Sequence, residues 1–265
     1  MHDSALAVRA THHLLLAHGY AVPLLRANSP GARVGITLNL SPVEPGGERA
    51  EDHAAAQLAD VINNRLYLDP LYRGTYPAEA MARFGEDAFG IQAGDMQVIG
   101  APLDFLGVNY YTRAIRVADP GGNPIGEQVQ IAGVERTDMG WEVYPEGLYT
   151  ILERVHREYR PGALYVTENG AAFADEVAPD GQVHDERRQA YLARHFAQAQ
   201  RLVADGVPLR GYFVWSLLDN FEWAEGYSKR FGIVYVDYAT QQRTVKDSGR
   251  WYADCIGART APLPV

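Results

Sequence analysis

Short apolar segments rich in β-branched and aromatic residues recur along the chain, and each is followed by a loop and then by a segment with helical periodicity. The predicted strands are residues 32–40, 103–111, 163–167 and 209–217. These segments are apolar at consecutive positions, which is typical of parallel strands that helices cover on both faces. The pattern therefore predicts an α/β fold of about four βα units with right-handed crossovers.

Apolar residues three or four positions apart mark the helices. The predicted helices are residues 2–18, before the first strand, and then 48–64, 145–159, 185–204 and 248–256. Pro161-Gly162 and Asp205-Gly206 are typical helix stops after two of them. With no repeat and no low-complexity linker, we expect residues 1–265 to form a single domain.

The remaining length falls into two long loops and one small hairpin. The loops are predicted at residues 69–102 and 113–140, and the hairpin at residues 231–246. Long loops at the carboxyl ends of barrel strands usually shape an active site. The sequence therefore indicates an enzyme or binding protein whose site lies at that end of the strands.

The composition limits which partners the protein can bind and in which cellular compartment we expect it. The formal net charge is −9, so the chain gains nothing from counterion release on nucleic acid, and we expect no nucleic-acid partner. No apolar run approaches the length that spans a bilayer, and no basic segment followed by an apolar run opens the chain. With Cys255 as the single cysteine, no internal disulfide can form, and we expect a cytoplasmic protein without membrane contact.

A carboxylate, Glu168, directly follows the third predicted strand and is followed by Asn169-Gly170. Barrel enzymes place catalytic groups at this position. Asn-Gly is also an ordinary turn dipeptide, so the residues alone favour a catalytic carboxylate and a simple surface turn about equally.

Asn109, Tyr110 and Tyr111 lie at the end of the second predicted strand. A tyrosine hydroxyl there can donate to a carboxylate on a neighbouring strand and favour its ionised form, as a nucleophile requires. Because the chain has 16 tyrosines, aromatic packing is the stronger interpretation for either tyrosine viewed singly.

A segment rich in aromatic residues begins at the end of the fourth predicted strand and combines ring faces with a carboxylate. It contains Trp215, Glu222, Trp223 and Phe231. Sugars are bound by this mixture, since rings stack on aromatic faces and carboxylates accept from hydroxyls. Core packing explains the tryptophans equally well, but it does not explain Glu222.

Three ordered motifs, GVNYYTR, YVTENG and VWSLLDNFEWAEGYSKRFGIVYVDY, resemble glycoside hydrolase family 1, the β-glucosidase family. NNRLYLDPLYRGTYP is similar to that family as well, and the similarity runs from residue 5 to residue 256. The resemblance implies a (βα)8 TIM-barrel fold and a retaining hydrolase of β-glycosides that needs no metal or other cofactor, because carboxylates supply the acid, base and nucleophile.

The resemblance also implies roles for individual residues. Glu168 matches the catalytic nucleophile. The other site residues match positions that hold it or bind the sugar: Asn109 and Tyr111 beside the nucleophile, Glu222 and Trp223 on the hydroxyls of the glycone, Trp215 beneath its ring, and Phe231 as a wall. A carboxylate at Glu222 would repel phosphate, so we expect unphosphorylated sugars. Lys229 and Arg230 are nearby cations that could instead favour a phosphate, but solvated loop charges are the stronger interpretation for both.

One family motif is missing. The acid/base of the family lies in an Asn-Glu-Pro motif after the fourth strand, and this sequence contains none. Glu44-Pro45 follows Val43 and falls after the equivalent of the fifth strand, so it cannot substitute. The chain thus resembles the carboxyl-terminal half of the family, a partial barrel of strands 5–8. Retaining hydrolysis needs two carboxyl groups about 5–5.5 Å apart, and we expect negligible hydrolysis by this chain alone.

A half-barrel would leave two open sheet edges and an uncovered apolar face. We therefore expect either a complementing amino-terminal half-barrel or self-association. Two alternatives remain open from the sequence: a non-catalytic carbohydrate-binding or interaction protein derived from a glycosidase, and a truncated gene product. A β-glycoside is the expected small-molecule substrate.

Overall fold

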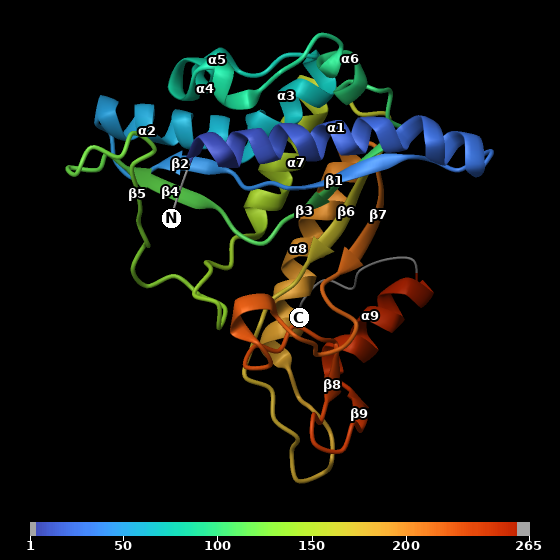
Figure 1. Ribbon diagram of the computed structural model, residues 1–265. Helices are drawn as coiled ribbons and strands as arrows, with labels where there is room; N and C mark the ends of the chain where they lie inside the picture. The colour runs from blue at the N-terminus through green and yellow to red at the C-terminus, as the bar shows by residue number, and fades with distance from the viewer. Residues whose placement is uncertain (1–3, 259–265) are drawn as a thin grey trace. The chain divides into compact units, whose positions relative to one another are not determined.

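The computed structural model describes residues 4–258 (Figure 1). All four predicted strands are present, and they form one sheet in the order β1-β3-β6-β7. They are β1 (Gly35–Asn39), β3 (Phe105–Asn109), β6 (Leu164–Asn169) and β7 (Leu209–Val214). Helices lie between successive strands of this parallel sheet, which confirms the α/β prediction, and within residues 4–258 the sheet does not close into a barrel.

The chain contains two compact units. The first unit comprises Met1–Val108, Ala114–Gln130 and Arg154–Leu164, and the second comprises Asn109–Arg113, Ile131–Glu153 and Tyr165–Val265. The boundary between them runs through β3 and β6, since each of these strands contributes residues to both units. The expectation of a single domain stays a prediction.

Helix α1 (Ser4–Asn28) in the first unit is longer than predicted and continues past Gly19 and Pro23. Gly19 is required by close packing, because a Cβ there would lie 2.2 Å from the carbonyl oxygen of Val98. The predicted start of this helix at residue 2 lies outside the described residues.

A continuous helical segment replaces the predicted helix 48–64 and extends beyond it. It consists of α2 (Ala50–Asp60), the π-helical turn η1 (Val61–Arg65) and α3 (Leu66–Arg73). The prediction that residues 69–102 form a loop is wrong, because three short helices follow: α4 (Ala78–Phe84), α5 (Glu86–Phe89) and α6 (Asp95–Ile99). Glycines with positive φ at residues 85, 90 and 94 separate them, and pieces this short carry no helical periodicity.

A small second sheet in the first unit was also not predicted. Strand β2 (Val43–Pro45) pairs in parallel with β4 (Ala114–Val117), with Val43 opposite Ala114. Strand β5 (Glu127–Gln128) then pairs antiparallel with β4. Two of these strands lie in the predicted loop 113–140, and strands of two to four residues are too short to show alternation.

The predicted helices of the second half are confirmed within two residues at each end. They are α7 (Pro145–Tyr159), α8 (Glu186–Ala204) and α9 (Asp247–Ala258). Proline opens α7 at the position where it is best tolerated, and Leu148, Leu152 and Val155 form its buried face. The spacing of Leu192, Phe196, Ala199 and Val203 predicts one apolar face for α8. The buried side of this helix also includes Arg188 and His195, whereas Val203 is 55% exposed.

The core of the second unit lies between α8, α9 and the residues after β6. It contains Val143, Ala171, Phe173, Tyr191, Leu192 and Ile233, with Val214, Val234, Trp251 and Tyr252 packed against it. The predicted hairpin is confirmed as β8 (Val234–Val236) paired antiparallel with β9 (Arg243–Val245). Among the described helices, none has the length and apolar character needed to cross a membrane.

Candidate active site

All seven sequence-predicted site residues belong to the second unit. Glu168 lies within β6, which extends one residue beyond it, rather than directly after the strand as predicted. The hydroxyl of Tyr111 donates a hydrogen bond to Glu168 Oε2 at 2.5 Å. Burial, and after it this hydrogen bond, raise the pKa of Tyr111, so the phenol keeps the proton that it donates.

Asn109 ends β3 and lies beside the residue that precedes the candidate nucleophile. Its Oδ1 accepts a hydrogen bond from the hydroxyl of Thr167 at 2.7 Å. The backbone N–H of Tyr110 donates to the carbonyl oxygen of Glu168 at 2.9 Å. These two bonds fix the backbone on both sides of the Glu168 side chain against the end of β3.

Trp215 follows β7 directly, and its backbone N–H donates to the carbonyl oxygen of Asn169 at 2.9 Å. The peptide bond between Trp215 and Ser216 is cis. The two chain segments approach so closely here that a Cβ at Gly170 would lie 1.7 Å from the carbonyl oxygen of Trp215. Glycine in the YVTENG motif is therefore a requirement of backbone packing.

Glu222 is half-buried in the loop after β7. Burial and the nearby charge of Glu168 raise the pKa of its carboxyl group, and a hydrogen bond from Trp215 opposes this rise. The charge of Glu222 in turn contributes to the raised pKa of Tyr111. Glu222 therefore lies close enough to Glu168 and Tyr111 for their charges to interact. Trp223 begins the short 3-10 helix η2 (Trp223–Glu225) and is 79% exposed, so its ring faces solvent.

Phe231 is 2% exposed and packs edge-on against Tyr111, with ring centroids 6.3 Å apart. Trp141, which the sequence analysis did not single out, contacts both: its ring lies 5.2 Å from that of Tyr111 and 6.1 Å from that of Phe231. Its place shortly before α7, at the end of a long connection after a strand, is a sequence signal that could have identified it.

A buried polar cluster lies next to the candidate nucleophile and was also missed. The amide of Asn169, fully buried, donates to the carbonyl oxygen of Tyr110 at 2.8 Å and to the hydroxyl of Tyr191 at 3.0 Å. The hydroxyl of Tyr212 donates to Asn169 Oδ1. Because the side chain of Asn169 has partners directly after β3, on β7 and on α8, the backbone next to Glu168 is held from three sides.

Arg230 was interpreted as a solvated loop charge, and this interpretation is wrong. Its guanidinium is 18% exposed and forms an ion pair with Asp219 at 2.6 Å. Lys229 donates to the carbonyl oxygen of Asp138 at 2.8 Å from an exposed position. The sequence could not distinguish the two neighbours, because burial depends on which side of the loop meets the hairpin, where Arg230 also donates to the carbonyl oxygen of Val236.

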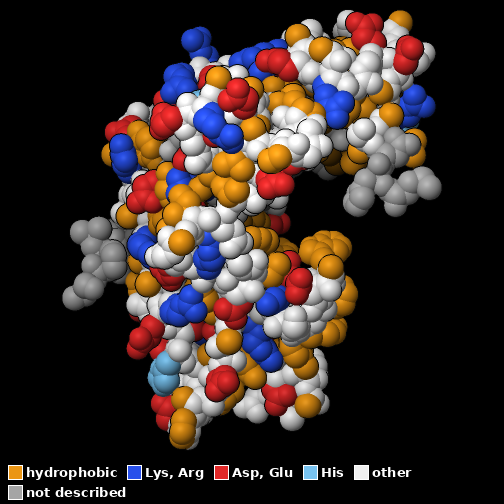
Figure 2. All heavy atoms as spheres, turned by 90° about the vertical axis from the view of Figure 1, so that its left-hand side faces the viewer, with side chains coloured by type: hydrophobic (Ala, Val, Ile, Leu, Met, Phe, Trp, Pro, Cys, Tyr) orange, Lys and Arg blue, Asp and Glu red, His pale blue; other side chains and the backbone are white. Residues whose placement is uncertain are grey.

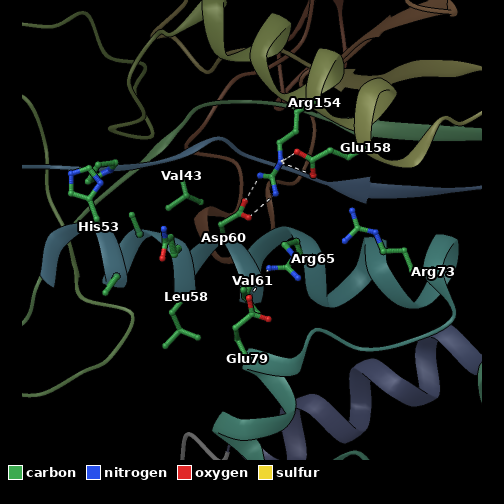
Figure 3. Close-up of a pocket in the computed structure, with 14 residues that line it drawn as sticks. Val43, His53, Leu58, Asp60, Val61, Arg65, Arg73, Glu79, Arg154 and Glu158 are labelled. Carbon is green, nitrogen blue, oxygen red and sulfur yellow. Dashed lines mark hydrogen bonds and ion pairs between the residues drawn. The ribbon is translucent and has the colours of Figure 1, made fainter. Parts of the chain in front are cut away.

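A cavity of about 670 Å³ in the first unit contains none of the predicted site residues (Figure 3). Its charged lining is already paired: Arg154 points from α7 toward Asp60, at 2.6 Å, and Arg65 pairs with Glu79 at 3.0 Å. Within residues 4–258, no group of three or more His, Cys, Asp or Glu side chains is arranged to hold a metal ion.

Comparison with known proteins shows which family the chain is similar to. Residues 1–260 match the model of Glycosyl hydrolase family 1. β-Glucosidase A of Thermotoga maritima is 48% identical over 262 residues, which is 97% of this chain and 57% of the relative. The 1,4-β-D-glucan glucohydrolase of Thermotoga neapolitana is 48% identical over 264 residues, covering 97% of this chain and 58% of that protein.

A solved structure gives the same result. The family 1 β-glucosidase from Thermotoga maritima in complex with isofagomine lactam matches with a TM-score of 0.91 and 47% identity, covering 99% of this chain and 59% of that structure. The chain therefore spans somewhat more than half the length of the relatives that it matches.

Proposed function

The chain belongs to glycosyl hydrolase family 1, and on this basis we propose that it forms the nucleophile-bearing part of a retaining β-glucosidase. Glu168 attacks the anomeric carbon of an unphosphorylated β-glycoside and forms a covalent glycosyl-enzyme, which water then hydrolyses with retention. Four βα units and the similarity to family 1 β-glucosidases support a partial (βα)8 barrel for this part of the enzyme.

The observation that carries the proposal is the 2.5 Å hydrogen bond from Tyr111 to Glu168. A nucleophile must be aimed at the anomeric carbon, and the phenol donor fixes one of the two carboxylate oxygens. Asn109 contributes by holding Thr167, the preceding residue. The attacking oxygen is then the one that Tyr111 leaves free.

The sugar would be held by the segment after β7. Glu222 offers carboxylate oxygens to vicinal hydroxyls, Trp215 and Trp223 offer ring faces, and Phe231 closes one side. The raised pKa of Glu222 reflects burial beside Glu168, and a phosphate placed there would add a third negative charge. This crowding of negative charge supports unphosphorylated substrates.

A fluorinated glucoside with a dinitrophenolate leaving group tests the nucleophile. Dinitrophenolate leaves without protonation, so the first step needs only Glu168: its oxygen bonds to the anomeric carbon as the leaving group departs with the bonding electron pair. We expect the mass of one fluoroglucosyl group on the peptide that contains Glu168. Binding of the sugar without a covalent adduct would instead favour a non-catalytic carbohydrate-binding protein.

Hydrolysis of ordinary glycosides needs a second carboxyl group that protonates the leaving oxygen. We propose that the amino-terminal part of a family 1 chain supplies it, since the relatives extend well beyond the matched length.

The surface of helix α1 supports such a partner. Leu15 and Val22 are buried on one face, whereas Leu14 and Leu24 are 71% and 63% exposed on the other, and a helix apolar on both faces is usually covered on both. Figure 2 shows further hydrophobic side chains at the surface on one side of the molecule.

Complementation with the part of Thermotoga maritima β-glucosidase A that this chain does not match tests this partner. We expect the two polypeptides to co-elute and to hydrolyse an alkyl β-glucoside that neither hydrolyses alone. Leu14→Glu should weaken the complex, whereas Ala27→Glu, at an exposed position near the end of α1, should not. Turnover of the glucoside by this chain alone would refute the need for a partner.

The single cysteine supports a cytoplasmic site of action.

A further inference from the structure

Six charged side chains of the second unit, five of them buried, alternate in sign and form a connected ladder. In order they are Asp185, Arg188, Asp175, Lys246, Asp219 and Arg230. We call this set the charge ladder. Five of its side chains are at most 3% exposed, and its three cations balance its three carboxylates.

Lys246 lies in the middle of the charge ladder and joins two loops that are distant in sequence. Its ammonium donates to Asp175 Oδ2 at 2.6 Å and to Asp219 Oδ1 at 2.9 Å. Asp175 lies in the loop that follows β6 and the candidate nucleophile, and Asp219 lies in the loop that follows β7 and carries Glu222.

Arg188 joins the same two loops a second time. Its guanidinium pairs with both oxygens of Asp175, at 3.0 and 2.7 Å. It also donates to the carbonyl oxygen of Ala171, in the first loop, at 3.3 Å and to that of Arg230, in the second loop, at 2.8 Å. The residue after Arg230 is Phe231, the predicted wall of the sugar pocket.

Asp219 fixes the second loop to the hairpin that follows it. Besides Lys246, it accepts from the guanidinium of Arg230 at 2.6 Å and from the backbone N–H groups of Gly232 at 3.0 Å and Val236 at 3.3 Å. Each carboxylate oxygen thus has two donors. The loop from Trp215 to Phe231 is held at Asp219 and Arg230, on both sides of Glu222.

Stability alone does not account for such an arrangement. Apolar side chains of similar volume often stabilise a protein as well as a buried ion pair does, because desolvation of the charges offsets their attraction. Charge-assisted hydrogen bonds differ from apolar contacts in fixing direction and distance. An array that joins the same two loops twice is therefore suited to fixing their relative geometry.

We propose that the charge ladder is a positioning device for the sugar site: Lys246 and Arg188 lock the loop after β6 to the loop after β7, so that sugar affinity depends on Lys246 although it does not touch the sugar. This inference rests on the proposed function for its sugar readout. Lys246 is accordingly a positioning residue, whose effect passes through Asp219 to Glu222 and through Arg188 and Arg230 to Phe231.

The test must separate bridging from charge balance. Lys246→Met removes the bridge and leaves an unbalanced carboxylate, whereas the double variant Lys246→Met/Asp175→Asn removes the bridge but keeps the ladder neutral. A matched control is Arg154→Met/Asp60→Asn in the first unit, which removes an ion pair of 2.6 Å and also preserves net charge.

Hydrogen exchange of the chain alone gives the first readout. In the neutral double variant we expect the amides between Leu217 and Phe231 to exchange about tenfold faster or more, while those of β6 and α8 keep their rates, as for a local opening. In the control variant the loop should keep its wild-type rates. Unchanged loop exchange, or a uniform increase over the whole second unit, would refute the positioning role.

Binding of isofagomine lactam gives the second readout, measured on the complemented protein by calorimetry. We expect the neutral double variant to bind at least about tenfold more weakly, a change of about 1.4 kcal/mol, and the control to bind as the wild type does. Full affinity in the double variant would mean that the charge ladder only balances charge and does not position the sugar site. A wild type that does not bind the lactam would contradict the proposed function, while the exchange experiment would still decide the positioning role.

Discussion

Both units bury polar side chains, but they use them differently. In the first unit, His12 of α1 lies between the hydroxyl of Tyr76, at 2.9 Å, and the carboxylate of Asp95 in α6, at 3.0 Å. Asp60 and Arg154 likewise join two helices. These interactions fasten helices to one another and to the chain between them.

In the second unit the buried polar groups hold the segments at and after the carboxyl ends of strands. Asn169 has partners directly after β3, on β7 and on α8, and the charge ladder joins the loops after β6 and β7. The same types of interaction therefore stabilise the scaffold in one unit and organise the candidate site in the other. Burial of polar groups is common to both units. The candidate site is distinguished by the segments that its buried polar groups hold, which lie at the carboxyl ends of strands.

The largest expected difference between the units concerns covalent labelling. Glu168→Gln should abolish the fluoroglucosyl adduct completely, because a neutral amide cannot attack the anomeric carbon. Glu79→Gln, in the first unit, changes a carboxylate that lines the cavity there and should leave labelling unchanged. Intact-mass spectrometry after a fixed incubation measures both, and an adduct on the Glu168→Gln protein would remove the basis for assigning the nucleophile.

Ion pairs of the charge ladder should contribute more to the free energy of unfolding than the ion pair between helices in the first unit. Arg188→Met leaves Asp175 and Asp185 buried without their main partner, and we expect a loss of about 3–5 kcal/mol in the free energy of unfolding. Arg154→Met should cost less, about 1–2 kcal/mol, because its side chain is 24% exposed and water can replace part of the interaction. Urea unfolding of the two variants measures this, and equal losses would contradict the comparison.

The buried His195 of α8 should make the second unit sensitive to acid. Burial lowers its pKa from 6.5 to about 3, and its Nε2 has no hydrogen-bond partner. Between these two values the unfolded chain binds a proton that the native state does not, so stability is fully present above about pH 6.5 and falls as the pH is lowered.

The expected slope from this group is about 1.4 kcal/mol per pH unit, or about 2 kcal/mol between pH 6.5 and 5. Urea unfolding at these two pH values should show a smaller decrease for His195→Gln than for the wild type. The matched control is His53→Gln, at an exposed position of the first unit, which should retain the wild-type decrease. An identical pH dependence in all three proteins would mean that His195 is protonated in the native state.

The smallest expected effect on stability lies within the candidate site. Trp223 is 79% exposed, so Trp223→Ala should change the free energy of unfolding by no more than about 0.5 kcal/mol. Phe231→Ala, at a position only 2% exposed, should cost about 3–5 kcal/mol. If Trp223→Ala weakens lactam binding in the complemented protein without this loss of stability, the ring contributes to sugar binding and not to folding. A large loss of stability in Trp223→Ala would exclude that conclusion.

Several features could not be predicted because they depend on contacts between distant residues. Trp141 gains its importance only by packing on Tyr111 and Phe231, which are 30 and 90 positions away in the chain. The burial of Arg230, and the exposure of Val203 on a helix face predicted to be apolar, likewise depend on what the fold brings alongside. The short helices between residues 78 and 99 were missed for a local reason, since each is too short for its periodicity to be detected.

The sequence by itself determined the four strands, the long helices and the identity of Glu168, Tyr111 and Glu222 as candidates. Apolar periodicity and local motifs encode these features within a few consecutive residues. Only the tertiary structure decided which donor meets Glu168, which aromatic rings surround it, and which buried charges hold the loop of Glu222. These depend on a few ångströms of separation between segments that the chain order leaves far apart, and hydrogen bonds and ion pairs form only at such distances.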